Sequence, residues 1–289
     1  MPARMLVGRS PACALRLDDR HVSGEHAALI WTGQGWEIRD LGSRNGTFVD
    51  GDRVQPGEPR TLPRGAKIGF GHSDDPWVLV DAGPPGAVAH DLDGDEVRVA
   101  EGGMLALPSE EEPEVVLYAN RSGHWVIEAD DAPSRAARAE EVVRAGGRSW
   151  RLYVPEPQEG TAAVDSGPSI DTVALRFAVS RDEEHVTLTI VHRGVEIPLE
   201  PREHGYTLLT LARQRLQDAD LPLAEQGWID RELLLRMLGL DANALNVAIY
   251  RARNQISDAG VDGAAGIVEV RRGQRRLGVE PERIEVTRP

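Results

Sequence analysis

Short runs of alternating apolar and polar residues fill the first eighty positions of the chain, and glycines separate the runs. A period of two is typical of strands that bury one face in a sheet. Asn45-Gly46, between two of these runs, favours a tight turn between antiparallel strands. The pattern therefore predicts an all-β domain over residues 1–81. Its expected core includes Trp36, Ile38, Leu41 and Val49.

Residues 82–155 continue the strand pattern after a cluster of chain breakers, Ala82-Gly83-Pro84-Pro85-Gly86. Short β-branched and aromatic runs alternate there with turn residues such as Gly146-Gly147. The expected strands are Val97–Val99, Val115–Tyr118, Trp125–Glu128 and Trp150–Val154. We expect a degenerate β-rich module that packs on the first domain or completes it.

Residues 156–169 are a predicted linker, because Pro, Gly, Ser, Ala and acidic residues replace large apolar ones there. Residues 170–289 form the expected last domain, which opens with three strand-like runs. These runs are Val173–Val179, Val186–Val191 and Gly194–Leu199. Apolar residues at helical spacing follow over Tyr206–Leu216. The last domain is therefore expected to be α+β.

Two further helices and a hairpin complete the predicted last domain. Asp230 is a suitable N-cap for a helix that Gly239 ends. A longer helix is expected from near Asp241 to beyond Ile256. The hairpin strands Ile267–Val270 and Arg276–Val279 flank a basic tip, Arg271–Arg275.

Charge and composition limit the classes of partner. The 289 residues carry a net charge of −14, but residues 191–289 hold 14 arginines against 15 acidic residues. The acidic excess therefore lies in the first two thirds, which cannot bind nucleic acid by bulk electrostatics. One cysteine, Cys13, fits a reducing compartment. With no apolar run near the roughly 20 residues of a membrane span and no signal peptide, we expect a cytoplasmic protein without membrane contact.

A candidate anion site appears in the first domain. Arg9 offers a guanidinium fork that stays protonated, and Ser23 offers a compact hydroxyl. Glycines near both residues allow sharp turns that expose backbone N–H groups. The Asn45 side chain is able to bond a local or a ligand backbone. Such converging donors suit a dianionic phosphate.

Three sequence blocks carry a family resemblance: Val7-Gly8-Arg9-Ser10, Val22-Ser23-Gly24-Glu25-His26-Ala27 and the stretch from Gly42 to Gly51. Together they resemble the forkhead-associated (FHA) domain, a β-sandwich that reads phosphothreonine. The resemblance implies phosphothreonine contacts from Arg9, Ser23, Gly24, Arg44 and Asn45. It implies structural roles for Gly8, His26, Gly46 and Thr47.

The chain departs from the FHA pattern at two points. Gly24 replaces the arginine or asparagine that often follows the serine. Only seven residues precede the Gly8-Arg9 pair, which is short for the first two strands of such a sandwich. Either the domain is trimmed, or the segment after Asp81 supplies the missing strands.

The last domain resembles the winged-helix effector domain of OmpR-type bacterial regulators. Leu199–Glu203 stands at that family's helix opening, and Leu245–Arg253 resembles its recognition helix. Asn and Arg side chains are suited to read base edges, and arginines are suited to grip phosphates. The resemblance implies DNA contacts from Asn243, Asn246, Tyr250, Arg251, Arg253, Arg271, Arg272 and Arg275. A balanced charge leaves protein docking open as the alternative use of this domain.

The expected function follows from both resemblances. The chain is expected to be a bacterial phosphothreonine reader that acts below a Ser/Thr kinase and captures a phosphorylated partner or segment. Its output is either phosphorylation-dependent transcription regulation through duplex DNA at residues 170–289, or an adaptor role that docks a protein. We expect no enzyme activity, because no catalytic triad order, P-loop, GxGxxG or metal-ligand spacing is visible. No cofactor or metal is expected.

Overall fold

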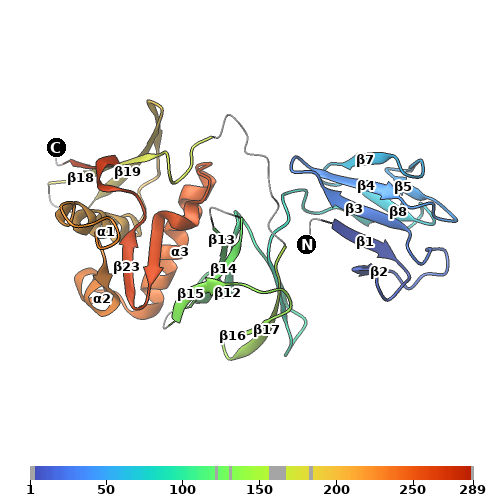
Figure 1. The fold of residues 1–289 in the computed structure, drawn as a ribbon, viewed down its shortest axis with the longest axis horizontal. Helices are drawn as coiled ribbons and strands as arrows, with labels where there is room; N and C mark the ends of the chain where they lie inside the picture. The colour runs from blue at the N-terminus through green and yellow to red at the C-terminus, as the bar shows by residue number, and fades with distance from the viewer. Residues whose placement is uncertain (1–3, 121–122, 130–131, 156–166, 182–184, 288–289) are drawn as a thin grey trace. The chain divides into compact units, whose positions relative to one another are not determined.

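A computed structural model describes residues 4–120, 123–129, 132–155, 167–181 and 185–287 (Figure 1). Residues 156–166 of the predicted linker lie outside the described residues. The chain divides into two compact units, Met1–Gly86 and Ala87–Pro289.

The first unit is built from two β-sheets. The larger has the order β2-β1-β3-β4-β7, with β1 and β2 parallel and the other pairs antiparallel. Its strands are β1 (Arg4–Gly8), β2 (Leu15–Arg16), β3 (Ala27–Trp31), β4 (Trp36–Asp40) and β7 (Pro59–Leu62). The smaller has the order β6-β5-β8-β9. Its strands are β5 (Thr47–Val49), β6 (Asp52–Arg53), β8 (Lys67–Phe70) and β9 (Trp77–Val78).

Apolar side chains from both sheets form the core of the first unit. Trp36, Ile38 and Val49 are buried there, as predicted. Leu41 is 43% exposed, against expectation, because it follows the end of β4 at a turn in which Gly42 has a φ of +79°. The short N-terminus itself supplies β1, and residues 79–86 add no strand to the sandwich.

The second unit begins with a module of two four-stranded antiparallel sheets, which we call the middle module (residues 87–155). The sheet orders are β11-β10-β17-β16 and β12-β13-β14-β15. The strands of the first sheet are β10 (Val88–Asp91), β11 (Val97–Val99), β16 (Val142–Ala145) and β17 (Arg148–Tyr153). The strands of the second are β12 (Met104–Pro108), β13 (Pro113–Ala119), β14 (Trp125–Ala129) and β15 (Ala132–Ala136).

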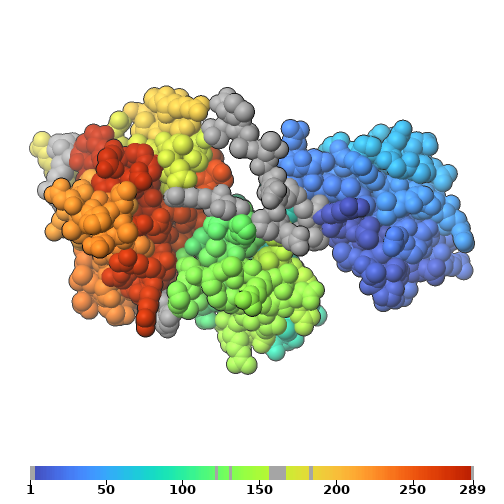
Figure 2. Space-filling view, viewed as in Figure 1, coloured from blue at the N-terminus to red at the C-terminus, as the bar shows by residue number. Residues whose placement is uncertain are grey.

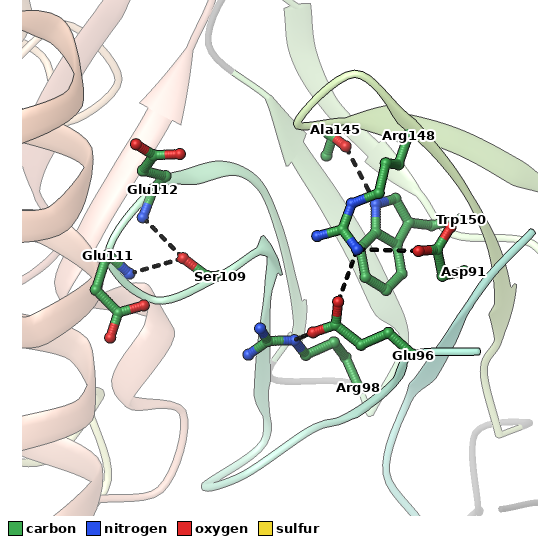
Figure 3. A network of polar contacts seen from close by, with 9 residues as sticks. All are labelled: Asp91, Glu96, Arg98, Ser109, Glu111, Glu112, Ala145, Arg148 and Trp150. Atoms are coloured by element: carbon green, nitrogen blue, oxygen red, sulfur yellow. Dashed lines mark hydrogen bonds and ion pairs between the residues drawn. The ribbon is translucent and has the colours of Figure 1, made fainter. Parts of the chain in front are cut away.

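A buried core and a polar network hold the middle module together. Leu107, Leu117 and Trp150 are buried between its two sheets. Arg148 pairs with Asp91 and Glu96 at 2.9 and 2.7 Å, and its guanidinium lies 4.8 Å from the Trp150 ring (Figure 3). The sheets of the middle module are separate from those of the first unit. Of the two expected arrangements, completion of the first domain by this segment is therefore wrong, and packing on that domain stays a prediction.

Beyond the middle module, the described residues of the second unit form two sheets and three helices. The first sheet, β20-β19-β18-β24, contains β18 (Ala174–Val179), β19 (Val186–His192), β20 (Val195–Pro198) and β24 (Ile284–Thr287), which runs parallel to β18. The second, β21-β23-β22, contains β21 (Ile229–Asp230), β22 (Val268–Arg271) and β23 (Gln274–Leu277). The helices are α1 (Gly205–Gln217), α2 (Arg231–Leu238) and α3 (Ala242–Asp258). Two short 3-10 turns are η1 (Ala264–Ile267) and η2 (Pro281–Arg283).

The capping residues fix the helix boundaries near their predicted places. The Asp230 carboxylate accepts a hydrogen bond from the Leu233 N–H, and Gly239 ends α2 with a φ of +65°. The Asp241 carboxylate accepts from the Ala244 N–H at the start of α3, 2.8 Å away. These contacts satisfy N–H groups that a helix start leaves without partners.

The hairpin turn lies at a different place from the predicted basic tip. Arg271 pairs with Gln274, so the turn consists of Arg272 and Gly273, whose φ is +70°. Arg275 is therefore a strand residue, opposite Val270, and is 2% exposed.

No single helix among the described residues is long and apolar enough to cross a membrane. Helices α2 and α3 meet the length and composition test only as a pair bent by 88°.

Candidate functional site

The predicted phosphate-binding loops of the first unit are joined by backbone hydrogen bonds. The Arg9 N–H donates to the Ser23 carbonyl and the Ser10 N–H donates to the Gly24 carbonyl, both at 2.9 Å. Gly8 makes this approach possible, because a Cβ atom there would lie 2.2 Å from the Gly24 oxygen. The loop after β1 and the loop before β3 thus act as one rigid segment.

Backbone contacts hold the polar groups of this surface in place, and several of their hydrogen-bond donors have no partner among the described residues. The Ser23 hydroxyl oxygen accepts from the Arg44 N–H at 3.1 Å, which leaves its own proton to donate. The side chains of Arg9 and Arg44 are exposed and make no hydrogen bond or ion pair with the residues that the structure describes. Arg9 and Arg44 both bond Ser23 through their backbone N–H groups. Two exposed guanidinium groups and a hydroxyl are donors of the kind that suits a phosphate dianion.

The His26 ring connects these loops through hydrogen bonds inside the domain. Its Nδ1 accepts from the Ser23 N–H at 3.0 Å, and its Nε2 lies 3.1 Å from the Gly46 carbonyl. The ring is fully buried and packs edge-on against Phe70. An Nε2–H tautomer satisfies both contacts, and burial lowers the pKa of His26 below its usual 6.5. The neutral imidazole therefore fixes Ser23 and the Asn45-Gly46 turn together.

Asp40 is a buried hub that the sequence analysis missed. Its carboxylate accepts from the Thr47 and Ser43 hydroxyls, both at 2.6 Å, and from the N–H groups of Gly42 and Ser43 at 2.9 Å. Burial opposes its ionisation, but these donors outweigh burial and lower its pKa. The local sequence contains a signal for this role, since an aspartate two residues before a Gly-Ser pair favours an Asx turn.

A second cluster holds the side chain of Asn45. The Asn45 Nδ2 donates to the His21 carbonyl at 2.8 Å. Asp19 accepts from the His21 N–H at 2.8 Å, lies 2.9 Å from His21 Nδ1, and lies 3.1 Å from His72 Nε2. The backbone N–H bond and the His72 contact lower the pKa of Asp19 to about 2. No sequence pattern signals this cluster, because His72 lies 53 residues beyond Asp19.

The structure thus brings the predicted residues of the first unit together around one surface. Backbone and side-chain bonds link the segments that contain Arg9, Ser23, Gly24, Arg44 and Asn45. Their contact with phosphothreonine stays a prediction. Gly24 has no heavy atom within 4 Å of an added Cβ, so this position is open.

The predicted DNA-binding residues on α3 lie in a different environment. Arg253 is fully buried and forms a bidentate pair with Glu128 of β14, at 3.2 and 2.9 Å. It also donates to the Val268 carbonyl at 2.7 Å and lies over the Tyr118 ring at 5.0 Å. Its guanidinium therefore has protein partners in place of phosphate.

Tyr250 and Asn243 also face the middle module. The Tyr250 hydroxyl, in a side chain that is 2% exposed, donates to Glu110 at 3.0 Å. Burial raises the pKa of Tyr250 to about 12. Asn243 Nδ2 donates to the Glu111 carbonyl at 3.3 Å. Figure 3 shows the loop with Ser109, Glu111 and Glu112 beside the C-terminal helix.

The other predicted DNA-binding residues are spread over the unit. Asn246 lines the narrow gap between α3 and β13. Arg251 is exposed on another side of α3, next to Arg202 in an open groove. Arg271 is exposed but stacks on Trp228 at 4.1 Å, and Arg272 is exposed at the hairpin turn. The predicted cluster is therefore not one surface, because α3 turns its sides toward different neighbours.

The described residues contain no group of three or more His, Cys, Asp or Glu side chains placed to hold a metal ion.

Comparison with known proteins identifies the family of the first unit, which contains the predicted phosphate-binding loops. Residues 5–71 match the FHA domain family, and they are an FHA domain. Nuclear inhibitor of protein phosphatase 1 from Homo sapiens is 32% identical over 113 residues, which are 37% of this chain and 32% of that protein. The FHA domain-containing protein FhaB of Mycobacterium tuberculosis is 42% identical over 50 residues, 17% of this chain and 32% of that protein. The chain thus spans about a third of the length of these curated relatives.

A solved structure is also similar to part of the chain. The N-terminal FHA domain of Rad53p from S. cerevisiae, solved in complex with a phosphothreonine peptide, is 27% identical. The match has a TM-score of 0.23 and covers 25% of this chain and 61% of that one.

Proposed function

We propose that this chain is a phosphothreonine reader in which Arg9, Ser23 and Asn45 bind the phosphorylated residue and its neighbouring backbone. One observation carries the proposal: Arg9 and Arg44 are exposed, their guanidinium groups have no partner among the described residues, and the backbone N–H groups of both residues bond Ser23. Around them, the FHA domain supplies fixed loops, so little ordering is needed when a ligand binds. A Ser/Thr kinase then acts upstream, and the ligand is a phosphorylated partner protein or segment.

The guanidinium groups and the asparagine have separate roles in this proposal. Arg9 and Arg44 neutralise a phosphate that carries about −1.5 to −2 charges at pH 7. Asn45 keeps its Oδ1 and one N–H for the peptide backbone, since only one amide hydrogen is used on His21. The phosphate therefore supplies affinity, and Asn45 aligns the peptide chain.

The output of the reader belongs to the second unit. The order of three strands, α1, α2, α3 and a hairpin supports the winged-helix resemblance, and with it a role in transcription regulation through duplex DNA. The burial of Arg253 and Tyr250 against the middle module favours the alternative, in which this unit is a non-enzymatic adaptor that docks a protein. DNA binding by α3 requires that this contact open. A cytoplasmic location fits either output.

Calorimetry on the full chain tests the reader function. The titrants are degenerate peptide libraries with a fixed central phosphothreonine, phosphoserine or threonine. We expect binding of the phosphothreonine library only, and loss of that binding in Arg9→Ala. Arg16→Ala is the matched control, because Arg16 is an exposed arginine on neighbouring β2. Equal binding of the threonine library would contradict the proposal.

A further inference from the structure

One stripe of α3 is an interface inside the second unit. Asn243, Asn246, Tyr250, Arg253 and Ser257 recur at intervals of three or four residues, so they share one side of the helix. We call this stripe the α3 face. Four of the five are hydrogen-bonded to the middle module: Asn243 to Glu111, Tyr250 to Glu110, Arg253 to Glu128 and Ser257 to Gly102.

Apolar contacts close the same interface. Tyr250 packs in one cluster with Met104, Ala106 and Val116 of strands β12 and β13, together with Ala265. The gap that remains between α3 and β13 measures about 20 Å³, which is room for about one water molecule. In Figure 2 the green atoms of the middle module lie beside red atoms of the C-terminal elements. No macromolecule reaches the α3 face while this contact exists.

The alternation of the strands separates this interface from the module's own core. On β13, Val115 and Leu117 are buried between the two sheets, whereas Val116 lies in the cluster with Tyr250. On β12, Leu105 and Leu107 belong to the module core and Ala106 to the α3 cluster. A change at Val116 or Ala106 therefore acts on the interface and leaves the module core intact.

The α3 face bonds the middle module through the same kinds of groups that would bind a nucleic acid. Carboxylates of Glu110 and Glu128 accept from Tyr250 and Arg253, in the way that phosphate oxygens accept from such donors. Asn243 and Asn246 add amide groups that suit base edges. An α-helix reads DNA by entering the major groove, which is about 12 Å wide, so a sheet on that side of the helix excludes the duplex.

We propose that the middle module masks the α3 face, and that α3 binds duplex DNA only when the contact with β12, β13 and the Glu110–Glu112 loop opens. The acidic module and the polyanion compete for the same side chains. This inference rests on the DNA output of the proposed function and is independent of phosphothreonine binding.

Full-length Val116→Arg tests the mask. An arginine at this buried position places a charge in the gap that Tyr250 and Arg253 also line, and it opens the interface. Val142→Arg is the matched control: it makes the same change in the same module, at a residue of β16 that is 51% exposed. Hydrogen exchange reports the opening of α3, and fluorescence anisotropy with labelled duplexes of mixed sequence reports binding at about 50 and 200 mM salt.

We expect Val116→Arg to bind duplexes at least tenfold more tightly than the wild type or Val142→Arg. The binding should weaken at the higher salt concentration, and adding Arg253→Ala should remove the gain. Ala106→Arg should behave like Val116→Arg, and Glu110→Ala should give a smaller gain of about twofold to fivefold.

Three results would overturn the inference. The first is faster exchange of α3 in Val116→Arg without tighter DNA binding, which would leave α3 as a protein-docking or structural helix. The second is an interface that stays protected in Val116→Arg combined with Ala106→Arg, which would make the contact permanent. The third is a gain that survives Arg253→Ala. Phosphothreonine calorimetry on Val116→Arg tells the two proposals apart, since retained peptide binding leaves the reader function standing.

Discussion

Two arginines that the sequence assigned to ligands have opposite surroundings. Arg9 is exposed, and its guanidinium has no partner among the described residues, while backbone bonds fix the loop that carries it. Arg253 is fully buried and its guanidinium is used by Glu128 and Val268. A fixed backbone with a free head group is ready for a ligand, whereas a satisfied head group must first lose its partners.

The architecture explains the difference. Arg9 lies in a loop at the end of β1, where the connection runs over the surface and the side chain faces water. Arg253 lies on a helix that packs on the β13 sheet, where a buried charge is tolerated only with a close counter-charge. Whether an arginine side chain is free to bind a ligand therefore depends on the element that carries it as much as on its chemistry.

The contrast is tested most strongly at Arg253. Arg253→Ala should lower the unfolding free energy of the second unit by about 3–5 kcal/mol, because the Glu128 charge stays buried without its partner. Arg251→Ala, two residues away and exposed, should change it by less than about 0.5 kcal/mol. Urea unfolding of the full chain measures both. Equal losses would show that Arg253 is as dispensable as a surface arginine.

The opposite outcome is expected at Arg9. Arg9→Ala should reduce phosphothreonine affinity by about 30-fold or more, since charge-assisted hydrogen bonds to phosphate are lost, each contributing about 1.5–3 kcal/mol. Stability should not change, because the side chain is exposed. Calorimetry gives the first value and urea unfolding the second. A variant that unfolds more easily but binds normally would reverse the roles of the two arginines.

An added side chain at Gly24 should sharpen the comparison. This glycine has no positive φ and open space around a Cβ, so Gly24→Arg fits without strain. A third arginine beside the phosphate site should raise phosphothreonine affinity by about fivefold to tenfold. Gly8→Ala is the contrasting variant, since its Cβ would lie 2.2 Å from the Gly24 oxygen and would separate the loops. No gain in Gly24→Arg would place the phosphate elsewhere.

The smallest predicted effect is the pH dependence of stability that His26 causes. Because burial lowers the pKa of His26, the unfolded chain binds its proton first as the pH falls below about 6.5. The stability that the neutral ring contributes is fully present above that pH. Below that pH this stability is lost, by at most about 1.4 kcal/mol per pH unit, until the pH reaches the pKa of His26 in the folded protein. NMR of the His26 ring should show the Nε2–H tautomer at pH 6.5. A ring already protonated there would contradict the bracing role.

Local sequence patterns predicted much of the first unit and the helices of the second. The FHA blocks are made of turns and adjacent strands, so Arg9, Ser23 and Asn45 were visible from short motifs. Asp230 and Asp241 cap the predicted helices for the same local reason. These features depend on residues that are close in the chain.

Contacts between distant segments could not be predicted. Glu128 lies 125 residues before Arg253, and nothing near either residue signals the pair. The Asp19–His72 contact could not be predicted for the same reason, because 53 residues separate its two partners. The sequence pattern did not show that Arg271 pairs with Gln274, so Arg275 was expected in the hairpin tip. That pairing places Arg275 in the strand, where its side chain is buried.

The most direct test follows both arginines in one sample. NMR of the arginine side-chain N–H groups of the full chain, with and without a phosphothreonine peptide that the calorimetry has selected, reports their exchange with water. We predict fast exchange at Arg9 that slows when the peptide binds, and slow exchange at Arg253 in both states. An Arg9 signal that ignores the phosphopeptide, or an Arg253 signal that exchanges as fast as that of Arg251, would contradict the account.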